Sequence, residues 1–202
     1  VNALHGRTGE DALIWGIGEY NSKGGVQVHT WGNGQMFGAD LGWCMEYGAE
    51  LATSWSLFEH GGSRTGTDFS LIDGANLVPR ASYRHMDLVA EYFTGTFLKG
   101  ASPEEDFMVF GASDGSRTSV MIMNRGFGEP RAYTLRLDGE ADRGDGLQLG
   151  VNASLDRAYR DEIGPRTTQV LVFEGDAVRR INYSSEDFDT ERPPSITMRK
   201  QD

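Results

Sequence analysis

The chain has 202 residues and a formal net charge of -11 at pH 7, with 38% apolar and 24% charged residues. This composition is that of an ordinary globular protein with enough chain to bury a sizeable core. The acidity argues against a surface that binds nucleic-acid phosphates, and the absence of a run of about 18 apolar residues argues against a membrane-spanning helix. The single cysteine, Cys44, allows no internal disulfide, and we expect it to be a small buried residue.

The first half of the chain reads as alternating strands and helices. Residues 12–18, "ALIWGIG", form an apolar run without alternation, as expected for a parallel strand covered on both faces. The periodicity then predicts a helix over residues 35–49 and a second buried strand over residues 51–59. After a long polar loop, Pro79 marks the first turn of another helix. This order predicts two successive parallel-sheet units.

Residues 99–202 have a different pattern. Short segments of alternating apolar residues are separated by Asp-Gly and other turn signals, which is typical of an antiparallel β-sandwich. The segments predicted as strands are 106–112, 117–124, 131–138, 146–155, 167–175 and 177–184. The Gly/Ser/Pro-rich join near residue 99 predicts a boundary between a first domain, residues 1–98, and a second, residues 99–202.

One acid stands out at the end of the first strand. Glu19 follows the apolar run directly and is followed by Tyr20 and Asn21. From its position alone, Glu19 is either a solvated residue at the strand boundary or a side chain that the strand aims at a ligand. The long loop after the second strand also holds two acids, Asp68 and Asp73, which we expect to be solvated turn residues.

Two strand–helix units cannot close an α/β barrel, which takes roughly 250 residues or about 30 per unit. They would leave two open strand edges and an exposed apolar surface. The sequence also begins at Val1 without a methionine or a signal-peptide pattern. We therefore expect that the rest of a barrel is missing upstream sequence or a separate chain.

The series "IGEYN", "TSWSLFE", "VPRASYRHMDLVAEYFTG" and "IGPRTTQVLVFE" resembles the C-terminal part of a clan A (β/α)8-barrel retaining glycoside hydrolase. The resemblance implies the last two βα units of the barrel, its seventh and eighth strands with their helices, followed by an antiparallel β-sandwich. In this family the seventh strand ends in the nucleophilic Glu, which matches Glu19, although Gly18 stands where Thr is commoner. The eighth strand carries a Trp near the sugar, which matches Trp55.

The resemblance also implies which residues contact the substrate. A retaining enzyme needs a nucleophilic carboxylate and a second, protonated carboxyl about 5 to 5.5 Å away. In this family that acid/base follows the fourth strand, so this chain alone is expected to be catalytically incomplete. Hydrogen-bond donors should surround the ionised nucleophile, and an aromatic ring should stack on the sugar. The expected substrate-binding residues are Trp55, Glu59, Tyr20, Asn21, Trp31 and His60, with Trp31 in the loop after the first strand and Asn33 near the helix N-cap.

Within the clan, the helix entrance "GNGQMFGADL" and the loop after Glu59 suggest agarases and porphyranases, with xylosidase- or arabinofuranosidase-like enzymes as the next choice. The expected partners are a carbohydrate substrate and the remainder of the barrel, with no nucleic acid, membrane, metal or cofactor. Such a polysaccharidase would be secreted or periplasmic. The alternative is a non-catalytic carbohydrate-binding or interaction module built on the β-sandwich.

Overall fold

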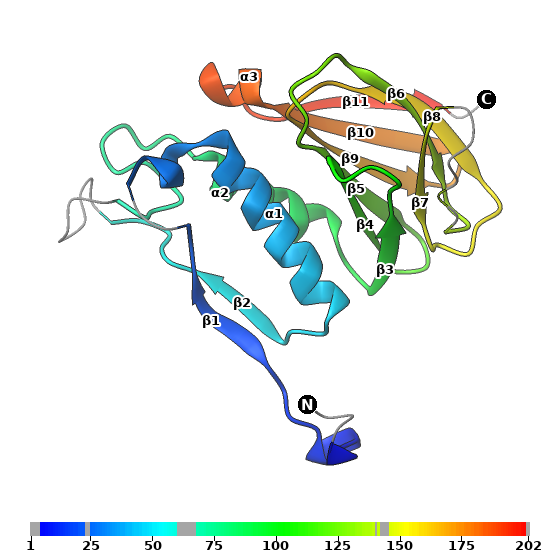
Figure 1. The fold of residues 1–202 in the computed structure, drawn as a ribbon, viewed down its shortest axis with the longest axis horizontal. Helices are drawn as coiled ribbons and strands as arrows, with labels where there is room; N and C mark the ends of the chain where they lie inside the picture. The colour runs from blue at the N-terminus through cyan, green and yellow to red at the C-terminus, as the bar shows by residue number, and fades with distance from the viewer. Residues whose placement is uncertain (1–4, 23–24, 60–67, 140, 142–145, 201–202) are drawn as a thin grey trace.

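The computed structural model describes residues 5–22, 25–59, 68–139, 141 and 146–200. These residues form a two-stranded parallel sheet, a pair of long helices and a nine-stranded sheet (Figure 1). The helices α1 (Trp31–Glu46) and α2 (Ala81–Tyr92) lie between the two sheets. Shorter helical segments are η2 (Gly9–Asp11), η3 (Gly25–His29) and α3 (Ser185–Asp189).

The two-stranded sheet has the predicted order of elements. Strand β1 (Gly16–Tyr20) pairs in parallel with β2 (Leu51–Ser54), and α1 makes the crossover between them. The two strands are therefore aligned with their C-terminal ends at the same edge. Strand, helix, strand, loop and helix follow one another as expected, so two successive parallel-sheet units are confirmed.

The expectation that the first strand is covered on both faces is wrong in this structure. The strand begins four residues later than the apolar run, and Leu13, Ile14 and Trp15 before it are 48%, 76% and 43% exposed. Leu51 at the start of β2 is also exposed. The physical reason is that α1 covers one face of β1 and β2, while no described residue forms a layer on the other.

Helix α1 begins earlier than its periodicity indicated, and its close packing on α2 depends on glycine. Thr30 is the N-cap and accepts a hydrogen bond from the backbone N of Asn33 at 3.2 Å, so Asn33 lies inside the helix. A Cβ added at Gly34 would lie 2.5 Å from the Cβ of Ala81, and one at Gly42 would lie 2.7 Å from the Phe110 ring. The missing side chains let α1 approach both α2 and the large sheet.

The large sheet contains all six predicted strands and three more. Its strands in chain order are β3 (Thr96–Ala101), β4 (Phe107–Ser113), β5 (Thr118–Asn124), β6 (Arg131–Arg136), β7 (Leu147–Val151), β8 (Ala158–Ile163), β9 (Thr167–Glu174), β10 (Ala177–Ser184) and β11 (Ser195–Lys200). Their order in the sheet is β11-β10-β9-β5-β4-β3-β7-β6-β8. All neighbours are antiparallel except β6 and β7, which are parallel. The expected boundary at residues 98 and 99 falls inside β3.

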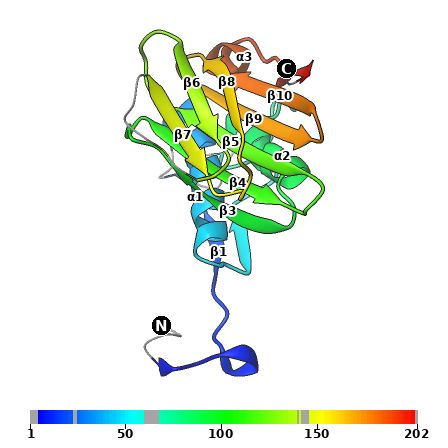
Figure 2. The same ribbon diagram turned by 90° about the vertical axis from the view of Figure 1, so that its right-hand side faces the viewer.

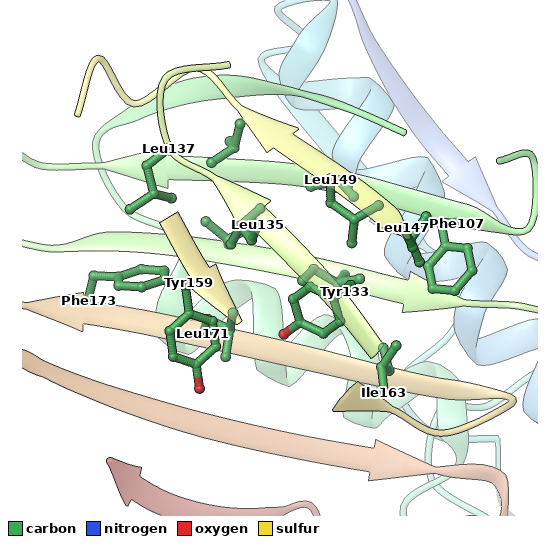
Figure 3. Close-up of a cluster of buried hydrophobic side chains, with 14 of the residues drawn as sticks. Phe107, Tyr133, Leu135, Leu137, Leu147, Leu149, Tyr159, Ile163, Leu171 and Phe173 are labelled. Carbon is green, nitrogen blue, oxygen red and sulfur yellow. The ribbon is translucent and has the colours of Figure 1, made fainter. Parts of the chain in front are cut away.

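The sheet curls so that β6, β7 and β8 lie over β4, β5 and β9 (Figure 2). A core fills the space inside the curl and includes Leu135, Leu149 and Leu171, each fully buried (Figure 3). A second core lies between the other face of the sheet and the helices, around Met121 and Tyr183. Strands β5 and β9 are therefore covered on both faces, which explains their nearly continuous apolar sequences.

Helix α2 is joined to the large sheet through a buried histidine. His85 Nε2 lies 2.8 Å from Oγ1 of Thr168 in β9, and Nδ1 lies 2.7 Å from the carbonyl oxygen of Ala81. Complete burial lowers the His85 pKa to about 4. The neutral imidazole therefore acts as a polar cross-link between helix and sheet, holding the first half of the chain on the second.

Candidate active site

Four of the predicted site residues lie together at the C-terminal edge of the two-stranded sheet. Glu19 is the penultimate residue of β1, and Trp55 follows the last residue of β2. The backbone N of Trp55 donates a 3.0 Å hydrogen bond to the carbonyl oxygen of Tyr20, which places the two strand ends side by side. A cleft of about 470 Å³ opens there, lined by Glu19, Tyr20, Asn21, Ser22, Trp55 and Phe69.

The Glu19 carboxylate is exposed in this cleft. Among the described residues, none donates a hydrogen bond to it or forms an ion pair with it. The expectation that donors surround the nucleophile is therefore not met by the residues that the structure describes.

Tyr20 and Asn21 brace the strand ends. The Tyr20 ring packs on Phe37 of α1 with its centroid 4.8 Å away, and its hydroxyl is buried without a partner among the described residues. Burial raises the Tyr20 pKa, and the nearby Asp40 raises it further. Asn21 Nδ2 donates to the carbonyl oxygens of Trp55 and of Phe69, the latter at 2.9 Å, so this amide ties β1 to the chain that follows β2.

Trp55 is held by the acid four residues later. Its indole is 49% exposed, and Nε1 donates a 2.7 Å hydrogen bond to Oε1 of Glu59. The second oxygen of Glu59 accepts a 2.8 Å bond from the backbone N of Phe69. The peptide bond between Trp55 and Ser56 is cis. Glu59 was expected to contact the substrate, but both of its oxygens have partners in the protein, so its geometry is that of a residue that orients the indole.

Two other expected site residues are not part of this cleft. Trp31 is the first residue of α1 rather than a loop residue, and it is only 1% exposed. Its ring packs edge-on against Tyr183 and His85, with centroids 4.8 and 5.1 Å away, so it belongs to the core between helices and sheet. The expected sugar contact of Trp31 is therefore wrong in this structure. His60 lies outside the described residues.

Sequence reasoning missed Arg80, whose side chain binds Asp68 and Asp73 on either side of the cleft residue Phe69. The Arg80 side chain is 6% exposed, and Nη2 lies 2.7 Å from Asp68 and 3.2 Å from Asp73. Burial acts to raise the Asp68 pKa, but hydrogen bonds from Ser70 and Arg80 outweigh it and lower this pKa to about 2. Asp68 is thus not a solvated turn acid, because it is paired with a buried arginine beside Phe69. Asp73 also pairs with Arg80, but it is partly exposed and accepts turn hydrogen bonds from the backbone N atoms of Ala75 and Asn76, as a turn acid does.

A metal centre finds no support in the described part of the chain, where no three His, Cys, Asp or Glu side chains gather as ligands would. Within the same residues, no helix is long and apolar enough to span a membrane. The cleft itself presents one carboxylate, that of Glu19, and one exposed indole, that of Trp55, at adjacent strand ends.

Comparison with known proteins bears on the fold that carries this site. No protein-family model matches the sequence, and neither does any curated protein. A solved structure of a glycoside hydrolase family 30 subfamily 8 xylanase from Clostridium acetobutylicum is similar, with a TM-score of 0.55 and 10% sequence identity. The similarity is to glycoside hydrolases. A family 30 endoxylanase from Clostridium papyrosolvens matches with a TM-score of 0.53 and 12% identity.

The matches cover most of this chain but less than half of each xylanase. They include 82% and 79% of this chain against 47% and 42% of the two solved chains. At these identities the similarity shows a glycoside-hydrolase-like fold, and it shows neither a substrate nor catalytic residues. The coarser expectation, that the fold resembles that of a glycoside hydrolase, is confirmed.

Proposed function

We propose that this chain is the nucleophile-bearing part of a retaining glycoside hydrolase of clan A, with Glu19 as the nucleophile. The observation that carries the proposal is that Glu19 and Trp55 line one cleft at the C-terminal ends of two adjacent parallel strands. Active sites of (β/α)8 barrels form at that end of the strands. On this proposal β1 and β2 are the seventh and eighth strands of the barrel.

The proposed reaction is a double displacement at the anomeric carbon. The Glu19 carboxylate attacks that carbon while an acid protonates the departing oxygen, and the resulting glycosyl-enzyme ester is then hydrolysed by water. The exposed Trp55 face stacks on the sugar ring, and Glu59 holds the indole at the required angle through Nε1. Because the Glu19 carboxylate is exposed, a substrate can reach it.

The second carboxyl of the mechanism does not come from the residues that line the cleft. Of those residues only Glu19 is acidic, and the neighbouring Glu59 has both oxygens in hydrogen bonds. We propose that the acid/base belongs to the remainder of the barrel, either as preceding sequence or as a separate chain. The open edges of β1 and β2 and the exposed Leu13, Ile14 and Leu51 are where that remainder would pack.

The proposed substrate is a polysaccharide. The sequence features favour agarose or porphyran, whereas the similar solved structures are xylanases, so both galactans and xylans belong in a substrate panel. An enzyme of this kind would act outside the cytoplasm, in the periplasm or after secretion.

Activity of the complete enzyme tests the assignment of Glu19. In Glu19→Gln, turnover should fall by about 10³-fold or more, because the amide does not form the covalent intermediate. In Glu19→Ala, which vacates the space of the carboxylate, added azide or formate should restore part of the turnover by attacking the anomeric carbon. The matched variant Glu50→Gln, an exposed acid outside the cleft, should leave turnover unchanged. Unchanged turnover in Glu19→Gln would refute the assignment.

A further inference from the structure

The flank of α1 that faces the large sheet carries a second concave surface, away from the cleft. One hollow of about 350 Å³ lies between α1, the segment after β5 and the β8–β9 turn. Another of about 290 Å³ lies between the end of α1 and the β3–β4 turn. Trp43 lines both hollows, so they adjoin on either side of its indole. We call this surface the Trp43 groove.

The Trp43 groove presents aromatic rings among hydrogen-bonding groups. Trp43 is 47% exposed, and no described residue accepts a hydrogen bond from its indole. Phe127 is 83% exposed in the first hollow, and the Arg166 guanidinium lies 5.2 Å from its ring centroid. The side chains of Arg125 and Gln35 line the same hollow. Exposed rings with polar groups beside them match a sugar, which has apolar ring faces and a rim of hydroxyls.

The two hollows of the Trp43 groove carry opposite charges. Arg125 and Arg166 line the first hollow, and Glu46, Glu104 and Glu105 line the second. Two of these acids are paired within the protein, Glu46 with Lys99 at 2.7 Å and Glu104 with Arg131 at 2.6 Å. A long partner with a strong charge of one sign would be attracted by one hollow and repelled by the other, so the groove favours a partner without a strong net charge.

The groove and the cleft are separate surfaces. The groove runs along α1, from Gly32 and Gln35 near the start of the helix to Trp43 and Glu46 in its last turn. The cleft lies at the C-terminal ends of β1 and β2, and the two surfaces share no residue. Trp43 is at the end of α1 that leads into the N-terminal end of β2, so a sugar bound on Trp43 would not lie at Glu19 and would not be cleaved there.

We propose that the Trp43 groove is a second, non-catalytic binding site for a neutral polysaccharide chain. In this site Trp43 stacks on a sugar ring where the two hollows meet, and Phe127 contacts a ring farther along the chain. Arg125, whose Nη2 already donates to the carbonyl oxygen of Glu105, donates other N–H groups of its guanidinium to hydroxyl groups. Such a site would keep the protein on an insoluble polymer between turnovers. The choice of ligand class rests on the proposed function, whereas the site itself does not depend on Glu19.

The test is affinity gel electrophoresis of the complete enzyme in gels that contain xylan, agarose or mixed-linkage β-glucan. At least one polymer should retard the enzyme, and Trp43→Ala should weaken the interaction about tenfold, as for loss of an aromatic anchor. Phe127→Ala should weaken it less. Tyr47→Ala removes an exposed aromatic at the same helix end that lines neither hollow, so it should leave the retardation unchanged.

Variants of the cleft separate this proposal from the proposed function. Retardation that persists in Glu19→Gln and Trp55→Ala but is lost in Trp43→Ala supports the groove, whatever the catalytic role of Glu19. Retardation that is lost only in Trp55→Ala would assign binding to the cleft and overturn the proposal. The proposal is also overturned if no polymer retards the enzyme, or if Trp43→Ala only abolishes self-association in sedimentation, which would make this surface a protein interface.

Discussion

Trp55, directly after β2, donates a 2.7 Å hydrogen bond from its indole to the carboxylate of Glu59, four residues later. The other Glu59 oxygen is bonded to the backbone N of Phe69, so one side chain connects the strand end to the far side of the long loop. The rim of the candidate active site is thereby ordered by the protein itself. The predictions below follow from this and from related contacts.

Removal of the Glu59 carboxylate should destabilise the protein. Glu59→Ala leaves the Trp55 indole and the Phe69 amide without their acceptors, and hydrogen bonds to charged groups typically contribute about 1.5–3 kcal/mol. Because Glu59 is partly exposed, we expect a loss of about 2 kcal/mol in the free energy of unfolding, measured with urea. Glu19→Ala is the same change at the neighbouring acid of the cleft, which has no such bonds to the described residues, and it should cost less than about 0.5 kcal/mol. Equal losses would contradict the positioning role of Glu59.

The contact between α1 and α2 should not accept a methyl group. Gly34→Ala would place a Cβ 2.5 Å from the Ala81 Cβ, so the two helices must separate, at a cost of about 1–3 kcal/mol. Gly32→Ala on the same helix meets only the Thr30 hydroxyl at 3.8 Å, and it should stabilise the helix by up to about 1 kcal/mol. Thermal unfolding of the two variants should therefore shift in opposite directions. A gain of stability in Gly34→Ala would refute the close approach.

The pairing of Asp68 with Arg80 should make stability depend on pH in the acid range. The folded pKa of about 2 is lower than the ordinary 3.8. The contribution is therefore fully present above about pH 4 and is lost as the pH falls towards 2. A shift of this size corresponds to about 2 kcal/mol. The side chain of Asp68 is only 11% exposed, so solvent screens the pair weakly.

Comparison of the parent protein with the Asp68→Asn variant should reveal this pH dependence. The gap in unfolding free energy between the parent and Asp68→Asn should be about 2 kcal/mol at pH 6 and should narrow as the pH falls below 4. Asp156→Asn, which removes one exposed negative charge elsewhere, is the matched control. A gap that stays constant from pH 6 to pH 3 would mean that the ion pair does not stabilise the loop.

Periodicity was sufficient where a segment is buried in a regular way. Strand β10 was predicted over residues 177–184 and has those bounds, and β5 and β9 differ by one residue at one end. By contrast, β3 was read as a linker because Lys99 and Gly100 weaken its pattern. It is a strand because β4 and β7 pair with it, which is a tertiary effect.

Part of the candidate site could also be predicted from the sequence. Glu19, Tyr20, Asn21 and Trp55 are adjacent to strand ends, and parallel pairing alone brings them together. Trp31 was misplaced because its neighbours Gly32 and Gly34 are poor helix formers, yet contact of Gly34 with Ala81 favours a helix there. Arg80 was missed because its partners, Asp68 and Asp73, are 12 and 7 residues away in a polar loop without periodicity.

The most direct test of the central proposal is to trap the covalent intermediate. The complete enzyme, treated with an activated 2-deoxy-2-fluoro glycoside of a sugar that it cleaves, should be inactivated and gain the mass of one fluoroglycosyl group. Mass spectrometry of its peptides should place that group on Glu19, in the peptide that contains "GIGEYN". A label on any other carboxylate, with Glu19 unmodified, would contradict the account.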